Sequence, residues 1–393
     1  MVLSNNDGCV IARSEEAKAL GIAMGTPSFF VEDFLKKNAV AVFSSNYTLY
    51  GDLSDRVMNT LHQFADQVEV YSIDEAFLDL SGMAYCNLKE YARKVKRTIK
   101  RNVGIPVSIG IAPSKTLAKM ANRFAKGRPA NQGVHIVDSE DKRIELLRQT
   151  EAGEIWGIGP QFTQLFKRLG FKTAFDVSAI PEDWMRKNLS VKGLRLLKEL
   201  QGTSCIELED MPASKKAVCV ARGFGQLLAG KSEIQEALSN YTSRCAEKLR
   251  AEKSVTRLVH VFLQTNAHRQ QDAQLNRSIN IRLTAPTNST NLLLKYAAQA
   301  LDHLYKPGYN YKKVGIMAMD LVSESVVQTD LFGGQPGGKS VELMKSLDTI
   351  NRQFGKESVR FVSQGFSQKW KLRQMKLSPC YTTRLEDILT INI

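Results

Sequence analysis

The sequence predicts a multidomain α+β protein, and three observations support that prediction. The chain has 393 residues, 43% of them hydrophobic, which is enough for about two to four globular domains. Residues 1–148 alternate helical and strand patterns, whereas residues 149–206 carry only short helical patterns. After a predicted linker at 207–217, residues 218–322 follow the order βαββαβ, and residues 323–393 form a tail.

Local signals place the elements of the first region. Ser14 is a predicted N-cap with Glu15 and Glu16 in the first turn, and Gly21 ends that helix. Apolar stripes at helical spacing predict two longer helices, one with Val57, Leu61 and Phe64 and one with Leu88, Tyr91, Ala92, Val95 and Ile99. The predicted strands are Val68–Ser72, Ala76–Leu80, Val107–Ala112 and Val134–Val137. We therefore expect helices packed on one small, mostly antiparallel sheet.

The later regions have their own patterns. Trp156-Gly157-Ile158-Gly159 precedes an amphipathic helix, and a second helix follows Gly170. The βαββαβ region is a predicted ferredoxin-like unit made of two split β-α-β motifs. Its expected elements are Ala217–Phe224, Glu233–Lys253, Arg257–Gln264, Ser278–Thr284, Asn291–Tyr305 and Lys313–Leu321.

Charge and cysteine usage narrow the function classes. The chain carries 54 Lys and Arg against 40 Asp and Glu, a formal charge of +14, so nucleic acid is the first partner to consider and a membrane surface the second. A basic soluble enzyme without a polyanionic partner stays open. Six scattered cysteines without metal-ligand spacing favour a reducing compartment and no zinc site. No membrane span or signal peptide is recognisable, so we expect a cytoplasmic protein.

The stretch Tyr71–Leu80 places Asp74 and Glu75 side by side between two predicted strands. Two adjacent carboxylates repel each other unless a cation lies close to both, and such oxygen ligands suit Mg²⁺. The pair therefore suggests a metal site at the end of a β-hairpin. Two solvated acids in a turn are the alternative interpretation.

Several segments, in this order, resemble Y-family translesion DNA polymerases. They are Ser4–Gly25, Asn46–Met58, Tyr71–Leu80, Ser108–Lys126 and Leu377–Arg384, together with the glycine turn at residues 156–159. The resemblance implies a right-hand polymerase with palm and fingers in residues 1–148, a helix-hairpin-helix thumb in 149–206 and a little finger in 218–322. It also implies error-prone extension of primers past lesions in the bacterial SOS response to DNA damage.

The resemblance assigns roles to matching positions. Asp74 and Glu75 would be catalytic and would help to hold two Mg²⁺ ions during attack of the primer 3′-hydroxyl on the α-phosphate of a dNTP. Nucleotide-binding positions would be Ile11, Ala12, Lys18 and Lys126. Ile11 and Ala12 would lie over the nascent base pair, and the two lysines would contact the triphosphate. On the helix that follows Ser114, Lys115 and Lys119 also carry charges able to reach phosphates.

Further positions predict contacts with DNA and with protein partners. The expected contacts to primer-template DNA are Gly157, Gly159, Arg222, Arg257, Arg282, Lys312 and Lys313. Gln328, Leu331 and Phe332 resemble the peptide that docks into a sliding clamp. By resemblance, a UmuD′-like dimer and a RecA filament are also expected partners, and the protein would be associated with the nucleoid.

The family also carries a third carboxylate and an aromatic steric gate on a first palm strand, which this sequence does not match. Asp7, Asp52 and Asp79 do not fall at the position of that carboxylate. We therefore expect an N-terminus shortened relative to the family, through a missed upstream start or a truncated gene. Without that strand, we expect backbone groups without hydrogen-bond partners and an apolar seam in the palm. On this view the alternative function is a catalytically impaired DNA- and clamp-binding protein.

Overall fold

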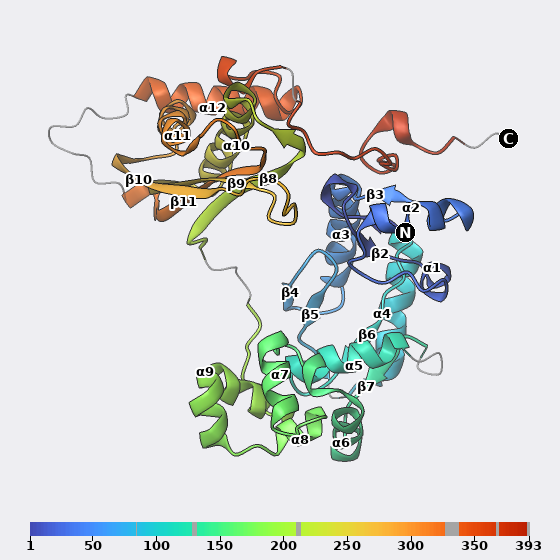
Figure 1. Cartoon of the computed structure of the whole chain (residues 1–393). Helices are drawn as coiled ribbons and strands as arrows, with labels where there is room; N and C mark the ends of the chain where they lie inside the picture. Colours follow the sequence, from blue (N-terminus) through green and yellow to red (C-terminus); the bar gives the residue numbers. More distant parts are fainter. Residues whose placement is uncertain (84, 128–131, 210–213, 327–337, 367–368, 391–393) are drawn as a thin grey trace. The chain divides into compact units, whose positions relative to one another are not determined.

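Figure 1 shows the computed structural model of the chain, which describes residues 1–83, 85–127, 132–209, 214–326, 338–366 and 369–390. The structure divides into two compact units. The first contains Met1–Ser45 and Ala213–Ser378, and the second contains Asn46–Pro212 and Pro379–Ile393. The predicted palm and fingers, residues 1–148, are therefore shared between the two units.

The N-terminal part of the first unit is a small three-stranded sheet with two helices. Its strands are β1 (Val2–Leu3), β2 (Val10–Ala12) and β3 (Phe43–Ser44), in the order β2-β1-β3, and its helices are α1 (Glu15–Ala19) and α2 (Ser28–Lys37). The Ser14 hydroxyl accepts a hydrogen bond from the Ala17 N–H, which confirms the predicted N-cap of α1. Leu3, Val10 and Leu35 lie in a shared core.

The largest sheet also belongs to the first unit and confirms the predicted βαββαβ order. Its elements are β8 (Ala217–Leu228), α10 (Lys231–Ala251), β9 (Ser254–Thr265), β10 (Asn276–Thr287), α11 (Thr290–Leu304) and β11 (Tyr311–Ser323). The strand order is β10-β9-β11-β8, and all neighbouring strands are antiparallel. Consequently β8 and β9 run parallel with β11 between them, and β10 and β11 run parallel with β9 between them. These are the two predicted split motifs.

Helices α10 and α11 cover one face of this sheet (Figure 1). Alternate residues of β9, namely Val259, Val261 and Leu263, are fully buried against them, because successive side chains of a strand point to opposite faces. After β11, helix α12 (Gly338–Gln353) is tied to α10 by an ion pair. The Arg250 Nε and Nη2 atoms lie 2.6 and 2.7 Å from the two carboxylate oxygens of Asp348.

The second unit begins with a helix and strand framework and continues into short helices. Its elements are α3 (Tyr47–Leu61), β4 (Val68–Val70), β5 (Ala76–Leu78), α4 (Leu88–Val103), β6 (Ile109–Ile111), α5 (Lys115–Gly127), β7 (Val134–Ile136), α6 (Glu140–Gln149), α7 (Pro160–Arg168), α8 (Ala174–Ser178) and α9 (Glu182–Leu200). The predicted stripes are confirmed, since Leu61, Phe64, Val95 and Ile99 share one core.

The prediction of one mostly antiparallel sheet in this region is wrong. β4 pairs antiparallel with β5 and β6 pairs parallel with β7, and within the described ranges no strand joins the two pairs. Both pairs instead line a cavity whose walls include Leu61, Leu78, Ile99 and Ile109. Among the described residues, each of these short strands therefore pairs with a single partner strand.

A buried carboxylate joins α9 to α5. Glu199 is fully buried, and its Oε2 accepts a hydrogen bond from the Thr116 N–H at 3.0 Å. Its Oε1 accepts from the N–H groups of Cys205 and Ile206, at 2.6 and 3.2 Å. In return, the Ser114 hydroxyl donates to the Glu199 carbonyl at 2.8 Å. A buried charge is stable only when donors surround it, so Glu199 holds the first turn of α5 in place.

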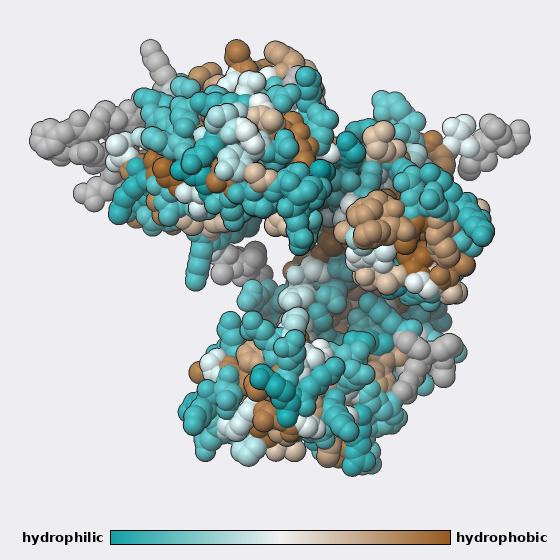
Figure 2. Space-filling model, in the orientation of Figure 1, coloured by the Kyte–Doolittle hydropathy of each residue, from teal (hydrophilic) through white to brown (hydrophobic). Residues whose placement is uncertain are grey.

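Hydrophilic side chains cover most of the face drawn in Figure 2, and an apolar area lies over α1 and α2. On α2, Phe29 and Phe30 are 69% and 74% exposed, whereas Leu35 is buried. This helix therefore joins the core through only part of its apolar surface. Across the described part of the chain, no helix is both long and apolar enough to cross a membrane.

We predict that Glu199→Ala lowers the free energy of unfolding by about 2–4 kcal/mol, because three N–H groups around it lose their acceptor. Chemical denaturation followed by circular dichroism measures this change. Glu182→Ala, in an exposed position of the same helix, is the control and should change stability by less than about 0.5 kcal/mol. Equal effects of the two substitutions would contradict the structural role of Glu199.

Candidate active site

The segment between β4 and β5 is a β-hairpin, as predicted, and it presents Asp74 and Glu75 at its end. The Glu75 carbonyl accepts hydrogen bonds from the N–H groups of Tyr71 and Ser72, at 3.1 and 3.0 Å, which closes the turn. The Ser72 hydroxyl donates to Asp74 Oδ1 at 2.7 Å. Glu75 Oε2 lies 3.0 Å from Nζ of Lys119 on α5. Each carboxylate is thus oriented by a donor.

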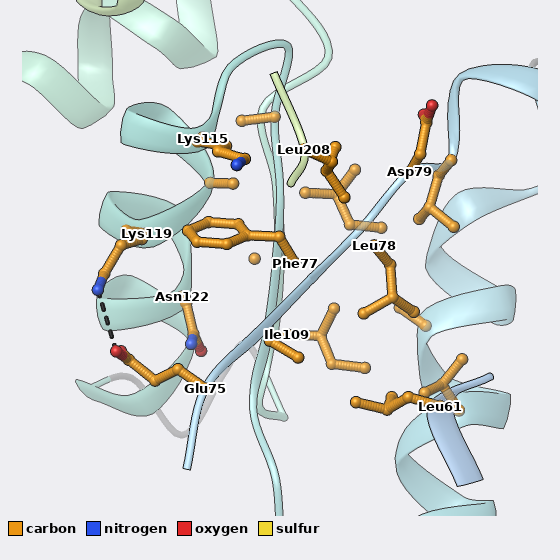
Figure 3. Close-up of a pocket in the computed structure, with 18 of the residues that line it drawn as sticks. Leu61, Glu75, Phe77, Leu78, Asp79, Ile109, Lys115, Lys119, Asn122 and Leu208 are labelled. Atoms are coloured by element: carbon orange, nitrogen blue, oxygen red, sulfur yellow. Dashed lines mark hydrogen bonds and ion pairs between the residues drawn. The ribbon is translucent and has the colours of Figure 1, made fainter. Parts of the chain in front are cut away.

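Both carboxylates line a cavity of about 890 Å³ in the second unit. Its walls come from α3, α4, α5, β5 and β6 and from residues 204–208. Figure 3 shows Glu75 and Lys119 joined near one end of β5 and Asp79 beyond its other end, with Leu78 and Ile109 between them. The cavity walls therefore combine apolar side chains such as Leu78 and Ile109 with polar ones such as Asn122, and charged groups lie beyond both ends of β5.

The other acids considered from the sequence do not complete a metal cluster. Asp7 lies in the first unit, where its carboxylate accepts from the Ser44 hydroxyl. Asp52 lies in α3. Asp79 lines the cavity, and the Ser81 N–H and hydroxyl hold the pKa of its carboxyl below the usual value. Among the described residues, no group of three or more His, Cys, Asp or Glu side chains could hold a metal ion.

The donor chemistry of Asp74 and Glu75 nevertheless fits Mg²⁺. In proteins, this ion is usually bound by one or two carboxylates together with substrate phosphates and water. Asp74 is exposed and Glu75 is partly exposed at the cavity, so a phosphate-bearing substrate has access to both. The pair therefore fits a Mg²⁺ ion that shares its coordination with such a substrate.

Lys115 does not point to a phosphate site, contrary to the prediction. Its side chain is 6% exposed and forms an ion pair with Glu69 of β4. Its Nζ also donates to the Glu207 carbonyl at 2.7 Å and lies 5.0 Å from the centre of the Phe77 ring. Lys115 therefore joins α5 to the hairpin strands and to the chain after α9.

The predicted nucleotide-binding residues belong to different units. Ile11 and Ala12 are exposed in β2, and Lys18 is exposed in α1, where its Nζ lies 2.6 Å from Glu15 Oε1. These three residues are in the first unit, whereas Lys126 lies exposed near the end of α5 in the second. The structure therefore leaves their joint role a prediction.

The predicted glycine turn lies directly before α7. Gly157 has a φ of +91° and Gly159 a φ of −90°, and both are exposed with no neighbouring atom within 4 Å of an added Cβ. α7 and α8 follow as the predicted short helices. The backbone of this turn is therefore accessible from solvent, and its contact with a DNA phosphate stays a prediction.

The five basic residues predicted on the little-finger sheet do not share one face. Arg282 pairs in register with Leu258, and Lys313 with Gln264, on the face opposite the helices. Arg222 pairs with the buried Val314 and so lies on the side of the helices. The two other residues, Lys312 and Arg257, are half-buried. Burial lowers the pKa of Lys312, and its Nζ donates to the Phe224 carbonyl at 2.7 Å.

The predicted clamp peptide, Gln328, Leu331 and Phe332, lies outside the described residues. Sequence reasoning missed the aromatic side chains next to the acidic pair, since Tyr71 and Trp156 both contact Lys119. Aromatic residues on each side of the acid pair were the available signal, but Trp156 comes close to them only through folding.

Three regions of the chain match known sequence families. Residues 1–123 match the impB/mucB/samB family, residues 215–331 match the C-terminal domain of that family, and residues 342–391 match a domain of unknown function, DUF4113. Protein UmuC of Salmonella typhimurium is 38% identical, over 100% of this chain and 93% of that protein. Protein MucB of Escherichia coli is 36% identical, over 97% and 91%. DNA polymerase IV 1 of Bacillus subtilis is 25% identical, over 90% and 83%.

Solved structures share the fold. A Y-family DNA polymerase chimera of Dbh and Dpo4 superimposes with a TM-score of 0.63 at 23% identity, covering 80% of this chain and 88% of that one. The resemblance inferred from the sequence is thereby confirmed at the level of family and fold. The prediction of a shortened N-terminus is not supported, because the alignment with UmuC covers 93% of that protein.

We predict that Gly157→Ala destabilises the protein by about 1–2 kcal/mol, because its φ of +91° is strained for a residue with a Cβ. Gly159→Ala is the matched control, since its φ of −90° suits alanine. It should change the free energy of unfolding by less than about 0.5 kcal/mol. Thermal unfolding of both variants measures the difference, and a more damaging Gly159→Ala would contradict this geometry.

Proposed function

Because the chain belongs to the impB/mucB/samB family, which is part of the Y-family of DNA polymerases, we propose that it is an error-prone translesion DNA polymerase. In this proposal, it extends primers past damaged template bases in the SOS response. The observation that carries the proposal is the pair Asp74 and Glu75, presented by a hairpin at the edge of a cavity.

Asp74 and Glu75 would hold Mg²⁺. When bound, the ion stabilises negative charge on the reacting phosphate and activates the primer hydroxyl. The chain's own residues supply the orientation of these ligands. Ser72 orients Asp74 through its hydroxyl, and Lys119 orients Glu75 through its ammonium group. Nucleotidyl transfer needs little protein chemistry beyond such positioning and electrostatic stabilisation.

The proposal assigns the incoming nucleotide to four side chains. Lys18 and Lys126 are exposed cations that attract the triphosphate. Ile11 and Ala12, exposed in β2, offer an aliphatic surface to the nascent base pair. Such a surface makes no base-specific hydrogen bonds, which is compatible with the insertion of nucleotides opposite altered bases.

DNA binding is assigned to the glycine turn and to the open face of the little-finger sheet. Gly157 and Gly159 bring backbone N–H groups to a phosphate. Arg282 and Lys313 are the stronger candidates on the sheet, because they share the face opposite α10 and α11. The net charge of +14 supports a mainly electrostatic, salt-sensitive affinity.

Protein partners are part of the same proposal and rest on the sequence. A sliding clamp would bind Gln328, Leu331 and Phe332. A UmuD′-like dimer and a RecA filament are proposed from the family, without contact residues assigned to them.

A test of the clamp contact is a binding titration with a peptide of residues 326–334, compared with one in which Leu331 and Phe332 are alanine.

We predict that Asp74→Asn and Glu75→Gln each lower primer extension at least about a thousandfold, roughly 4 kcal/mol of transition-state stabilisation. The measurement is single-nucleotide incorporation on undamaged and abasic templates with Mg²⁺. Asp66→Asn, which alters an exposed acid of the same unit, is the control and should leave the rate unchanged.

Two outcomes would contradict this assignment. Activity retained by both variants would show that Asp74 and Glu75 are not the catalytic acids. An unmodified chain that binds primer-template DNA in a salt-sensitive way but incorporates no nucleotide would instead support a non-catalytic, DNA-binding role.

We further predict that Gly159→Ala weakens DNA binding by about three- to tenfold without loss of stability, because the added methyl group separates the turn from a phosphate. Fluorescence anisotropy with labelled primer-template DNA at several salt concentrations measures the affinity. Arg282→Gln should weaken binding and reduce its salt dependence by about one released counterion. Unchanged affinity of the Gly159→Ala variant would exclude the turn as a DNA contact.

A further inference from the structure

Lys119 occupies a position between the acidic pair and two aromatic rings. Its Nζ lies 3.0 Å from Glu75 Oε2, 4.5 Å from the centre of the Tyr71 ring and 5.1 Å from the centre of the Trp156 ring. The side chains of Lys119 and Glu75 are 22% and 35% exposed. One ammonium group therefore has two kinds of partner within reach, a carboxylate and a pair of aromatic faces.

The rings around Lys119 form a connected aromatic cluster of Tyr71, Phe77 and Trp156. Trp156 packs edge-on against Tyr71 with ring centres 5.5 Å apart, and it lies 5.8 Å from Phe77. Its Nε1 also donates to the Tyr71 hydroxyl at 3.2 Å. The cluster thus joins the hairpin that carries Asp74 and Glu75 to the turn that carries Gly157, through contacts among the rings themselves.

A divalent cation on Glu75 and the Lys119 ammonium group are in competition. Both are attracted to the same carboxylate, and two cations that close to each other repel strongly. A lysine without a second partner would then have to move into water. Here the faces of Tyr71 and Trp156 remain available to it, because cation–π attraction does not require the carboxylate.

We propose that Lys119 is a positioning residue that orients Glu75 in the metal-free protein and shifts fully onto Tyr71 and Trp156 when a divalent cation binds. The inference rests on the proposed function, since it requires a metal at Asp74 and Glu75. It adds a consequence for the thumb. Metal binding changes the electrostatic environment of Trp156, the residue directly before the DNA-contacting turn.

The test uses two readouts that do not depend on polymerase activity. In a Trp184→Phe, Trp370→Phe background, Trp156 is the remaining tryptophan of the chain, and its emission is followed during a Mg²⁺ titration. Affinity for Mn²⁺ is measured by the paramagnetic resonance of the free ion. We expect the emission of Trp156 to shift as Mg²⁺ is added and to become constant once the site is filled.

Lys119→Met removes the charge while retaining an apolar side chain. We expect this variant to bind Mn²⁺ about two- to fivefold more tightly, because a competing ion pair is gone, and to lose the shift in Trp156 emission. Lys119→Arg should retain the shift. Lys94→Met, which alters an exposed lysine of α4, is the matched control and should behave like the parent protein.

The outcomes separate this inference from the proposed function. Mn²⁺ binding that is absent both with and without a dNTP, or unaffected by Asp74→Asn and Glu75→Gln, overturns the metal site itself. Binding that depends on those acids, together with an unchanged Trp156 shift in Lys119→Met, overturns only the role of Lys119. If Lys119→Met does not fold, the parent protein decides, because metal binding without any shift in Trp156 emission also overturns that role.

Discussion

The contact between the Lys119 ammonium group and the Glu75 carboxylate is the interaction on which the candidate active site depends. Asp74 and Glu75 are neighbours in the chain, and each has a hydrogen-bond donor or a cation close to its carboxylate. The Ser72 hydroxyl comes from the hairpin itself, and the Lys119 ammonium group comes from α5. Since Lys119 also contacts Trp156, the acidic pair links three elements that are distant in the sequence. The candidate active site therefore depends on electrostatic compensation as well as on backbone pairing.

Other charged groups fix the position of α5 relative to the hairpin and to α9. Glu199 accepts hydrogen bonds in a fully buried position, and Lys115 forms an ion pair with Glu69 where both are mostly buried. Such groups contribute little net stability compared with apolar residues, but removing one partner leaves a buried charge without compensation. They therefore favour one arrangement of α5, and that arrangement brings Lys119 to Glu75. The neighbouring strand pairs are too short to impose it alone.

The little-finger sheet shows how much of a fold a sequence can predict. Its strands have 12 or 13 residues, long enough for the alternation of buried and exposed side chains to be clear. In the second unit, by contrast, each strand has three residues. The pattern located those strands but gave no information about their partners, because pairing between short strands is decided by the surrounding helices and the cavity. The predicted single sheet failed for that reason.

The sequence by itself determined the features that depend on near neighbours: the Ser14 cap, the hairpin with adjacent acids, the glycine turn at Gly157 and the βαββαβ order. Only the tertiary structure decided which charged residues are available for function. Lys115 and Lys119 lie one helical turn apart with the same chemistry. Yet one is buried against Glu69, 46 residues away in the chain, and the other reaches Glu75. The environment of a charge is set by residues that folding brings close, and local sequence patterns do not record it.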